Sequence, residues 1–457
     1  MTRSPSGLDA ETLRSRLDQM AARSGIRQWD LGAACSTDTS VQVDRGEAKQ
    51  MKGAQRSSIT VRVWNDDGLV GITSTSDLSD AGLERALAGA SEASAFGNAD
   101  DIPAFSPLAT APLQPLDQPI KDPVSILDLL ATLKDAEHQL LESHPAIDTV
   151  PYNGLAQRSS DRIYLNSAGA CRQQQLTTAS LYLYARAEEA GRKPRSAGAV
   201  RLAYGAADLD IAGCIEEAAG LTASHLDYAP IETGRYTCVF SPEAFLDLIG
   251  AFSNLFNARA VLDGVSLSNR ESLGESLAVP FLDLHDHGRH PGNIGASAFD
   301  GEGTPTARLA LLEGGVLRHF LHSEATARAF GVAPTGHAGM GAKVSVGPDW
   351  FEIGPTPGSG GGQQGLNRFT AADPIVWIDS LSALHAGVKA SQGSFSLPFD
   401  GWLLRRGERR SIEAATVAGD IRQVLKAIVG FEGEPQITPD GVCPHVWVEG
   451  LSITGEA

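Results

Sequence analysis

The chain has 457 residues, enough for two or three domains of ordinary size. It carries 37 Lys and Arg against 55 Asp and Glu, which gives a formal net charge of −18. This balance excludes a dedicated binder of nucleic acid or of an anionic membrane, because affinity for phosphate depends on clustered positive charge. The 49 glycines and 24 prolines predict many turns, whereas 42% hydrophobic residues is typical of a folded globular chain.

The N-terminal segment and the cysteines bear on the cellular compartment. Residues 1–25 lack the apolar core of a secretory signal, and Leu13, Leu17 and Met20 mark one face of an expected helix with Asp9 as its N-cap. The sequence has no run of 18 apolar residues, so we expect no membrane span. The five cysteines are far apart and form no CxxC pair, which favours the reducing cytoplasm.

The first hundred residues show the patterns of strands and helices. Alternation of apolar and polar residues predicts strands around 41–43, 59–64 and 70–75, and an Asp-Gly pair supplies the turn between the last two. Ser79 is the expected N-cap of the helix that follows.

A proline-rich segment separates this part from the next. Residues 101–123 contain six prolines, a density that excludes helix and central strand and predicts an extended connector. After it we expect a helix over 124–141, strands at 163–165 and 181–185, and a helix over 211–223.

The last part of the chain is dominated by strands that glycines interrupt. A strand at 236–240 precedes a helix predicted from Pro242 to about Asn257. Short helices are expected near 323–330 and 418–429, and the glycine-rich stretch 354–365 is expected to be a flexible loop.

These elements predict an α+β fold, with N-terminal mixed sheet-and-helix subdomains followed by a β-rich C-terminal domain. The expected parts are an N-terminal α+β subdomain at 1–100, the Pro-rich connector at 101–123, a second α+β subdomain at 124–230 and the β-rich domain at 231–457.

Three histidines in the stretch LHDHGRHPGN are weak candidates for metal ligands. His285, His287 and His290, together with Asp283 and Asp286, offer donor types that zinc accepts. However, the glycine and proline of this stretch predict a loop, which positions ligands poorly, and no cysteine stands nearby at zinc-finger spacing. A solvated loop is the favoured interpretation.

Two carboxylates in the stretch FDGEG are weak candidates for substrate binding. Asp300 and Glu302 are two residues apart, a spacing that suits a metal, an acid–base pair or the amine of a peptide. The alternative is an acidic turn whose side chains accept backbone N–H groups, the more usual role of Asp near Gly.

Other catalytic motifs give weaker signals. The glycines at 358–365 lack the Lys and Ser/Thr of a phosphate-binding loop, and no G-x-S-x-G sequence occurs. No histidine is followed directly by Glu, which excludes an H-E-x-x-H helix. Cys443 is a candidate thiolate ligand, although a buried cysteine is the default interpretation.

From about residue 35 onward the sequence resembles the TldD/PmbA family, whose second member is also called TldE. The resemblance runs through RVWNDDGLVGITSTSDLS, YLNSAG and SLSNRESLGE, and is densest in FDGEGTPTARLALLEGGVLRHFLHSEATARAFG at 299–331. It continues through TGHAG and ends with GSFSLPFDGWLLRRGE and ATVAGDIRQVLKAIVG.

The resemblance implies a PmbA/TldE-type subunit. TldD-type chains of the family carry an H-E-x-x-x-H helix and a late cysteine that hold the catalytic metal. Where that helix is expected, this chain reads SPEAFLDLIGAF, and Pro242 and Asp247 occupy the histidine positions around Glu243. We therefore expect no catalytic or metal-binding residue and no cofactor in this chain, and a zinc or iron site in a TldD-like partner.

The expected function is that of an accessory, non-catalytic subunit of a metallopeptidase that cleaves unstructured peptides, in proteolysis or in the maturation of ribosomally made peptides. The expected partners are a TldD-like catalytic subunit and a peptide substrate. Two alternatives stay open. One is a homodimeric peptide-binding protein without protease activity, and the other is an active metallohydrolase with an unusual metal site at the three histidines.

Overall fold

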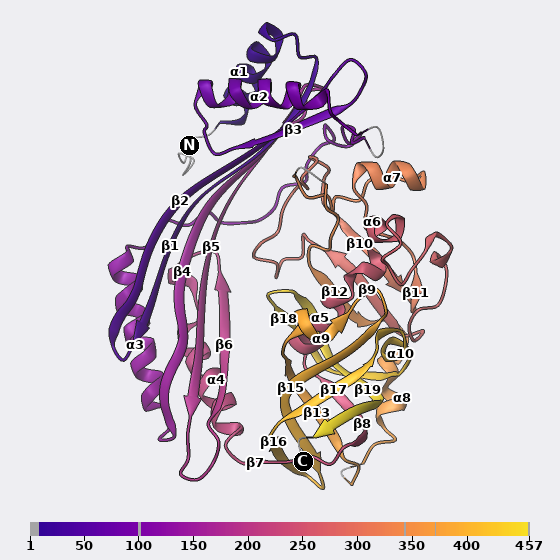
Figure 1. Cartoon of the computed structure of the whole chain (residues 1–457). Coiled ribbons are helices and arrows are strands. Elements are labelled where there is room, and N and C mark those ends of the chain that lie inside the picture. Colours follow the sequence, from indigo (N-terminus) through magenta and orange to yellow (C-terminus); the bar gives the residue numbers. More distant parts are fainter. Residues whose placement is uncertain (1–8, 99–101, 342–343, 371, 456–457) are drawn as a thin grey trace. The chain divides into compact units, whose positions relative to one another are not determined.

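The computed structural model describes residues 9–98, 102–341, 344–370 and 372–455 (Figure 1). The chain divides into two compact units, and each unit is assembled from three stretches of sequence. Unit 1 comprises Met1–Thr222, Ile294–Thr306 and His322–Val346, and unit 2 comprises Ala223–Asn293, Ala307–Leu321 and Gly347–Ala457.

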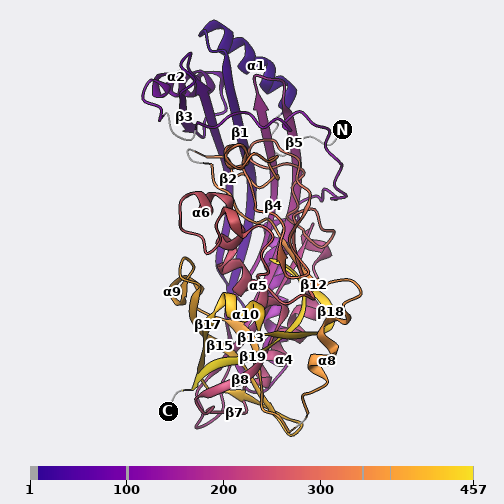
Figure 2. The ribbon, with the colours of Figure 1, turned by 90° about the vertical axis from the view of Figure 1, so that its right-hand side faces the viewer.

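Unit 1 is built on a six-stranded sheet with the strand order β3-β2-β1-β4-β5-β6, in which all neighbours are antiparallel. Strands β1, β2, β4 and β5 have 17 to 20 residues each, and Figures 1 and 2 show that they are curved. The strands are β1 (Gln28–Asp44), β2 (Glu47–Trp64), β3 (Val70–Thr75), β4 (Ile147–Asn166), β5 (Cys171–Ala187) and β6 (Arg195–Ala203).

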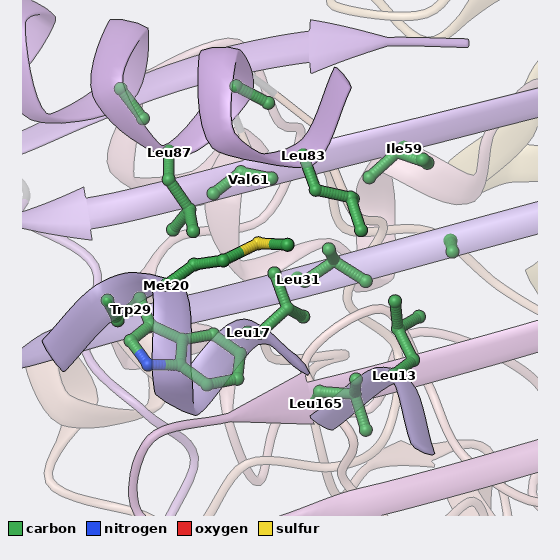
Figure 3. Packing of buried hydrophobic residues seen from close by; sticks show 14 of the residues in the cluster. Leu13, Leu17, Met20, Trp29, Leu31, Ile59, Val61, Leu83, Leu87 and Leu165 are labelled. Carbon is green, nitrogen blue, oxygen red and sulfur yellow. The ribbon is translucent and has the colours of Figure 1, made fainter. Parts of the chain in front are cut away.

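Helices α1 (Ala10–Arg23) and α2 (Asp80–Ser94) cover one end of one face of this sheet. The Asp9 carboxylate accepts the Thr12 N–H at 2.8 Å, which confirms the predicted N-cap. Leu13, Leu17 and Met20 of α1 point onto the sheet, where they pack among buried side chains of both helices and of β1, β2 and β4 (Figure 3). This cluster is a hydrophobic core of unit 1.

Three further helices belong to unit 1. They are α3 (Ile126–Glu142), α4 (Ile211–Ser224) and the short α7 (Glu324–Phe330). Before α3, the described residues 102–125 form neither helix nor strand, because their prolines lack the backbone donor that both structures require.

Unit 2 contains a thirteen-stranded sheet with the main order β11-β10-β9-β12-β19-β8-β13-β15-β16-β7. Strand β17 pairs with both β15 and β19, so the pairings of β19, β8, β13, β15 and β17 close into a ring. The strands are β7 (Tyr228–Ala229), β8 (Gly234–Phe240), β9 (Leu282–His287), β10 (Arg308–Glu313), β11 (Val316–Leu317), β12 (Phe351–Pro355), β13 (Ile375–Leu381), β14 (Val388–Lys389), β15 (Ser394–Arg405), β16 (Glu408–Ile412), β17 (Ala415–Asp420), β18 (Ile428–Thr438) and β19 (Gly441–Gly455).

Short helices join the strands of unit 2. They are α5 (Pro242–Ala251), α6 (Ala258–Leu262), α8 (Gln363–Leu366), α9 (Leu384–Gly387) and α10 (Ile421–Lys426). The 3₁₀ helices of the described chain are η1 (Ala206–Asp208, in unit 1), η2 (Ser253–Phe256), η3 (Arg270–Ser272) and η4 (Gly360–Gly362). In the described part of the chain, no helix has both the length and the apolar character needed to cross a membrane.

The predicted α+β class with a β-rich C-terminal part is confirmed. Two local predictions were wrong. The stretch 354–365 is not a flexible loop throughout, because it contains the end of β12, the 3₁₀ helix η4 and the start of α8. The helix that begins at Pro242 ends at Ala251, and a 3₁₀ helix follows it. The expected domain boundaries at 100, 123 and 230 stay predictions.

Candidate functional site

Helix α5, which follows β8, is held in place by a cap and by apolar packing. The Ser241 hydroxyl accepts the Ala244 N–H at 3.0 Å, and Pro242 occupies the first turn. Phe245 and Leu248 are fully buried. The helix contains no histidine, so its inward positions are occupied by packing groups in place of imidazole ligands.

Carboxylates and a thiol lie in and near α5, and burial disfavours the charged forms of Asp247 and Cys443. Burial, then the charges of Glu243 and Asp440, raise the pKa of Asp247 to about 7. Cys443 in β19 is completely buried, and burial raises the pKa of its thiol well above the usual value. Within the described ranges, no three His, Cys, Asp or Glu side chains are grouped so that they could hold a metal ion.

The histidine stretch is not the loop that the sequence predicted. His285 and His287 lie in strand β9, which pairs with β10 and β12, and only His290 lies in the turn beyond it. The prediction was wrong because the glycine and proline follow the strand and do not interrupt it. His290 stacks on Trp350 with ring centroids 4.6 Å apart. The metal role of these histidines stays a prediction.

The imidazole of His287 contacts a carboxylate from the neighbouring strand β12. The Glu352 carboxylate lies 2.8 Å from His287 Nδ1 and accepts a hydrogen bond of 2.8 Å from Arg308 Nε. Burial raises the pKa of Glu352, but the hydrogen bonds and charges of Arg308 and His287 outweigh it and lower this pKa to about 2. The group is an ion network that ties β9, β10 and β12 together.

Asp300 forms an acidic turn of the kind expected as the alternative to a binding site. Its carboxylate accepts backbone N–H groups from Glu302 at 2.8 Å, Thr304 at 2.9 Å and Ala338 at 2.9 Å. Asp300 is buried, and burial raises the pKa of its carboxyl, opposed by these three bonds. The carboxylate is thus used to hold the turn to the segment around Ala338.

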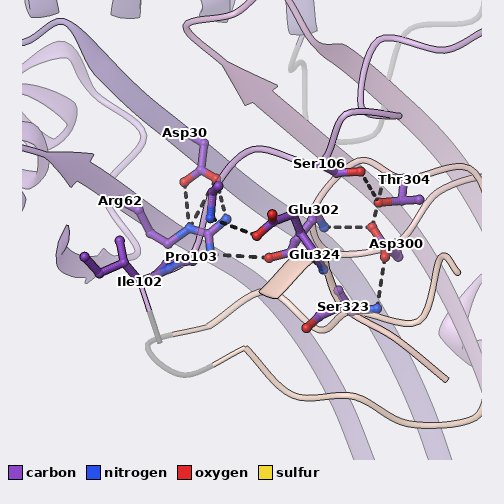
Figure 4. Close-up of polar contacts among 12 residues, drawn as sticks. Asp30, Arg62, Ile102, Pro103, Ser106, Asp300, Glu302, Thr304, Ser323 and Glu324 are labelled. Atoms are coloured by element: carbon purple, nitrogen blue, oxygen red, sulfur yellow. Dashed lines mark hydrogen bonds and ion pairs between the residues drawn. The ribbon is translucent and has the colours of Figure 1, made fainter. Parts of the chain in front are cut away.

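Glu302 belongs to a buried group with one cation and two acids (Figure 4). The Arg62 guanidinium donates from Nε to Asp30 at 2.9 Å, whereas its Nη1 lies 3.7 Å from Glu302 Oε1. All three side chains are fully buried, and the Tyr164 hydroxyl also donates to Asp30, at 3.1 Å. Burial raises the pKa of Glu302 to about 7, although the Arg62 charge opposes this.

The arrangement around Arg62 explains which acid takes up a proton. One guanidinium balances one negative charge, and Asp30 has the shorter hydrogen bonds to it. Neither Arg62 Nη1 nor Glu302 Oε1 has a hydrogen-bond partner in the described structure. The other Glu302 oxygen accepts the Glu324 N–H at 2.8 Å, so this carboxyl has a backbone donor on one oxygen and only the longer ion pair on the other. The weak prediction that Asp300 and Glu302 bind substrate stays a prediction, and both are buried here.

The same sheet face carries a hollow further along the strands, which we call the arginine hollow. Its volume is about 900 Å³, and its lining includes Arg56, Arg158, Arg162 and hydroxyl groups of Ser58, Ser160 and Thr178. A smaller hollow of about 290 Å³ shares Arg56, Arg158 and Thr178 with it. All lining residues of both hollows belong to unit 1.

The sequence interpretation missed these arginines and the buried Arg62 group. The available signal was the strand alternation itself. In β2 the apolar residues Ile59, Val61 and Val63 face the core, so the polar residues between them, including Arg62, face the other side of the sheet. Extending that alternation back to Arg56 would have marked the whole polar face.

Sequence comparison identifies three domain models of one family along the chain. The PmbA/TldA metallopeptidase domain 1 matches residues 36–94, the central domain matches 119–226 and the C-terminal domain matches 233–455. A similar curated protein is the metalloprotease PmbA of Escherichia coli O157:H7, which is 22% identical over 439 residues, covering 93% of this chain and 92% of that protein.

Solved structures show the same fold. A putative modulator of a DNA gyrase from Thermotoga maritima superimposes with a TM-score of 0.85 at 25% identity, over 98% of this chain and 100% of that one. TldE from Thermococcus kodakarensis gives a TM-score of 0.83 at 18% identity, with the same coverage. Because the three domain models follow one another along most of the sequence, the chain belongs to the PmbA/TldD metallopeptidase family.

Proposed function

We propose that this chain is the accessory, non-catalytic subunit of a TldD/TldE-type metallopeptidase that cleaves unstructured peptides. The observation that carries the proposal is helix α5. At the place where the resemblance puts the metal-binding helix of a catalytic subunit, α5 offers Pro242, Glu243 and Asp247 and no imidazole.

The neighbourhood of α5 supports the same conclusion. A hydrolytic zinc site needs three protein ligands and a bound water that the metal activates. Asp247 is half-buried beside two other acids, and the raised pKa of its carboxyl makes it a poor anionic ligand at neutral pH. The fully buried Cys443 thiol is likewise disfavoured as a thiolate. A TldD-like partner would supply the metal, zinc or iron, and the cytoplasm is the proposed location.

The test is co-expression with a TldD-like chain from the same cell. The two chains should co-purify, and cleavage of an unstructured peptide should require both. Substituting the partner's motif glutamate should abolish cleavage, whereas Glu243→Gln in this chain should leave the rate within about twofold. The matched control is Glu47→Gln, whose carboxylate is 88% exposed.

Two results would contradict the proposal. Full cleavage by this chain alone, lost on His287→Ala, would favour a metallohydrolase with a metal at the histidine strand. A stable homodimer that binds peptides but neither associates with a TldD-like chain nor supports cleavage would favour a stand-alone peptide-binding protein.

A further inference from the structure

We propose that the arginine hollow binds a carboxylate of an extended peptide, and that a tyrosine surface beside it holds an apolar side chain of the same peptide. This inference rests on the proposed function, because it takes a peptide as the ligand. It adds a preference for acidic peptides and places that preference in unit 1.

The hollow has more positive than negative charge. Arg56, Arg158 and Arg162 line it, and Lys52 lines the smaller hollow that adjoins it. The acids in the two linings are Asp38 and Asp161. In a chain with a net charge of −18, this local excess of cationic side chains favours the binding of anionic groups.

Two of the arginines are positioned for a further anion. Arg56 of β2 and Arg158 of β4 flank β1 and approach Asp38 of that strand at only 3.9 and 3.5 Å. Their side chains are 60% and 52% exposed, whereas Asp38 is 25% exposed and accepts the Ser36 hydroxyl at 2.9 Å. One aspartate at these distances does not satisfy two guanidinium forks, each of which matches a carboxylate with two parallel hydrogen bonds.

Tyrosines continue the same sheet face. Successive residues of a strand alternate between faces, so Gly154 and Tyr152 lie on the face of Arg158. The Tyr182 ring lies over Gly154, where a Cβ would come within 2.5 Å of it, and Tyr184 lies over Gly198 in the same way. The missing side chains of these glycines therefore leave the space that the two rings occupy over the sheet.

The tyrosine surface is open, and the hydroxyl of one of its rings is held by a hydrogen bond. Tyr152 is 72% exposed and pairs across the strands with Tyr184, which is 38% exposed. The Tyr182 hydroxyl accepts a hydrogen bond from Gln42 Nε2 at 2.8 Å. Rigid tyrosines give contact area at a small cost in conformational entropy, which suits them to bind apolar side chains.

The spacing along β4 defines the ligand. Four residues separate Arg158 from Gly154, which corresponds to roughly 13 Å of strand. An extended peptide covers that distance in four residues, so the structure favours a carboxylate and an aromatic side chain four positions apart. The carboxylate can come from an acidic side chain or from the peptide's C-terminus.

The experiment measures peptide binding by the full chain alone, without cleavage. The probe is a fluorescein-labelled, C-terminally amidated glycine–serine peptide with one Glu and one Phe four positions apart. Its binding is measured by fluorescence anisotropy. A second peptide has Gln in place of Glu, and a third has Gln and a free C-terminal carboxylate. We expect the second peptide, with Gln and an amidated C-terminus, to bind about tenfold more weakly than the Glu peptide. The third peptide shows whether a terminal carboxylate restores binding.

Substitutions locate the site. The double variant Arg56→Gln/Arg158→Gln should weaken binding of the Glu peptide about tenfold or more. It should leave the affinity for the Gln peptide unchanged. The double variant Arg56→Lys/Arg158→Lys should retain part of the affinity for the Glu peptide. Arg27→Gln is the matched control, because that side chain is 85% exposed and makes an ion pair of 3.5 Å elsewhere in unit 1. Tyr182→Ala, which removes the ring over Gly154, should weaken binding of the Phe peptide and leave the binding of a peptide with Ala in place of Phe unchanged.

Several outcomes would overturn the inference. They are equal affinity for the Glu and Gln peptides, no effect of the double substitution in a variant that keeps the wild-type Tm, no measurable binding of any peptide, or tighter binding of a dT oligonucleotide than of the Glu peptide. Because this chain is measured alone, any of these results leaves the two-chain cleavage test of the proposed function standing.

Discussion

The buried Arg62 group shows how a single residue can make stability depend on pH. Asp30 has the short hydrogen bonds to the guanidinium, and Glu302 is left with a longer ion pair and a pKa raised to about 7. The folded protein therefore keeps a proton on Glu302 at a pH where the unfolded chain has released it. Stability from this group is complete below the unfolded pKa of about 4.5 and falls as the pH rises toward 7.

The substitution Glu302→Gln should remove that dependence. The variant's free energy of unfolding, relative to wild type, should improve between pH 5 and pH 8, by up to about 3 kcal/mol. Urea denaturation at several pH values measures it. The control Glu47→Gln removes a carboxylate that is 88% exposed and should not change the slope. A constant difference between Glu302→Gln and wild type at every pH would contradict the expectation.

Among the elements, helix α1 shows which parts of the fold the sequence predicts. Its apolar face, its N-cap and its burial follow from spacing alone, because one helix face packs on one sheet. Strands β4 and β5 are different. They are 20 and 17 residues long, but only their apolar parts at 163–165 and 181–185 were predicted. The rest of β4 and β5 is rich in polar residues, among them Arg158, Ser160 and Thr178 of the arginine hollow, so the hydrophobic alternation is weak there.

The candidate sites follow the same division. The sequence marked Asp300 and the histidines, since each is clustered along the chain, but it could not group Asp30, Arg62 and Glu302, which are far apart in sequence. Arg56 and Arg158 meet only because β2 and β4 both pair with β1. Contacts made by strand pairing depend on register, which one sequence does not specify.

The packing of α1 can be tested at Leu17. The Leu17 side chain is completely buried between α1 and the sheet. Leu17→Ala should therefore destabilise the protein by about 2–5 kcal/mol through lost burial and a residual cavity. The matched control is Leu127→Ala in α3, where the side chain is 67% exposed and the change should cost less than about 0.5 kcal/mol. Urea denaturation of both variants provides the measurement, and equal losses would show that α1 does not stabilise the sheet.

At the scale of the whole molecule, unit 1 is not one continuous stretch. Its sheet ends by Ala203, but Ile294–Thr306 and His322–Val346 also belong to it. The first of these carries Phe299, which packs with Tyr164, Ala109 and Ala170, and it also carries Glu302. The sheet face around Arg62 is therefore completed by residues far downstream.

A fragment of residues 1–222 should consequently be less ordered than one of residues 1–346. Both contain only Trp29 and Trp64, and in the full chain Trp64 donates from Nε1 to the Pro103 carbonyl at 2.8 Å and is 6% exposed. We expect acrylamide to quench tryptophan fluorescence more strongly in the shorter fragment, because it lacks Glu324, which accepts the Ala104 N–H at 3.1 Å and so holds the segment that contacts Trp64. Equal quenching would show that the downstream segments are not needed for this face.

The discontinuity also imposes an order of events on protein synthesis. When residue 222 has left the ribosome, all six strands of the unit 1 sheet are available, and Arg62 can already pair with Asp30. Glu302 and Phe299 arrive about 80 residues later, which at the usual rate of translation is a delay of roughly 4–16 s. During that interval the nascent sheet exposes Tyr164 and its neighbours, so the growing chain should be a client of ribosome-associated chaperones until residue 346 has emerged.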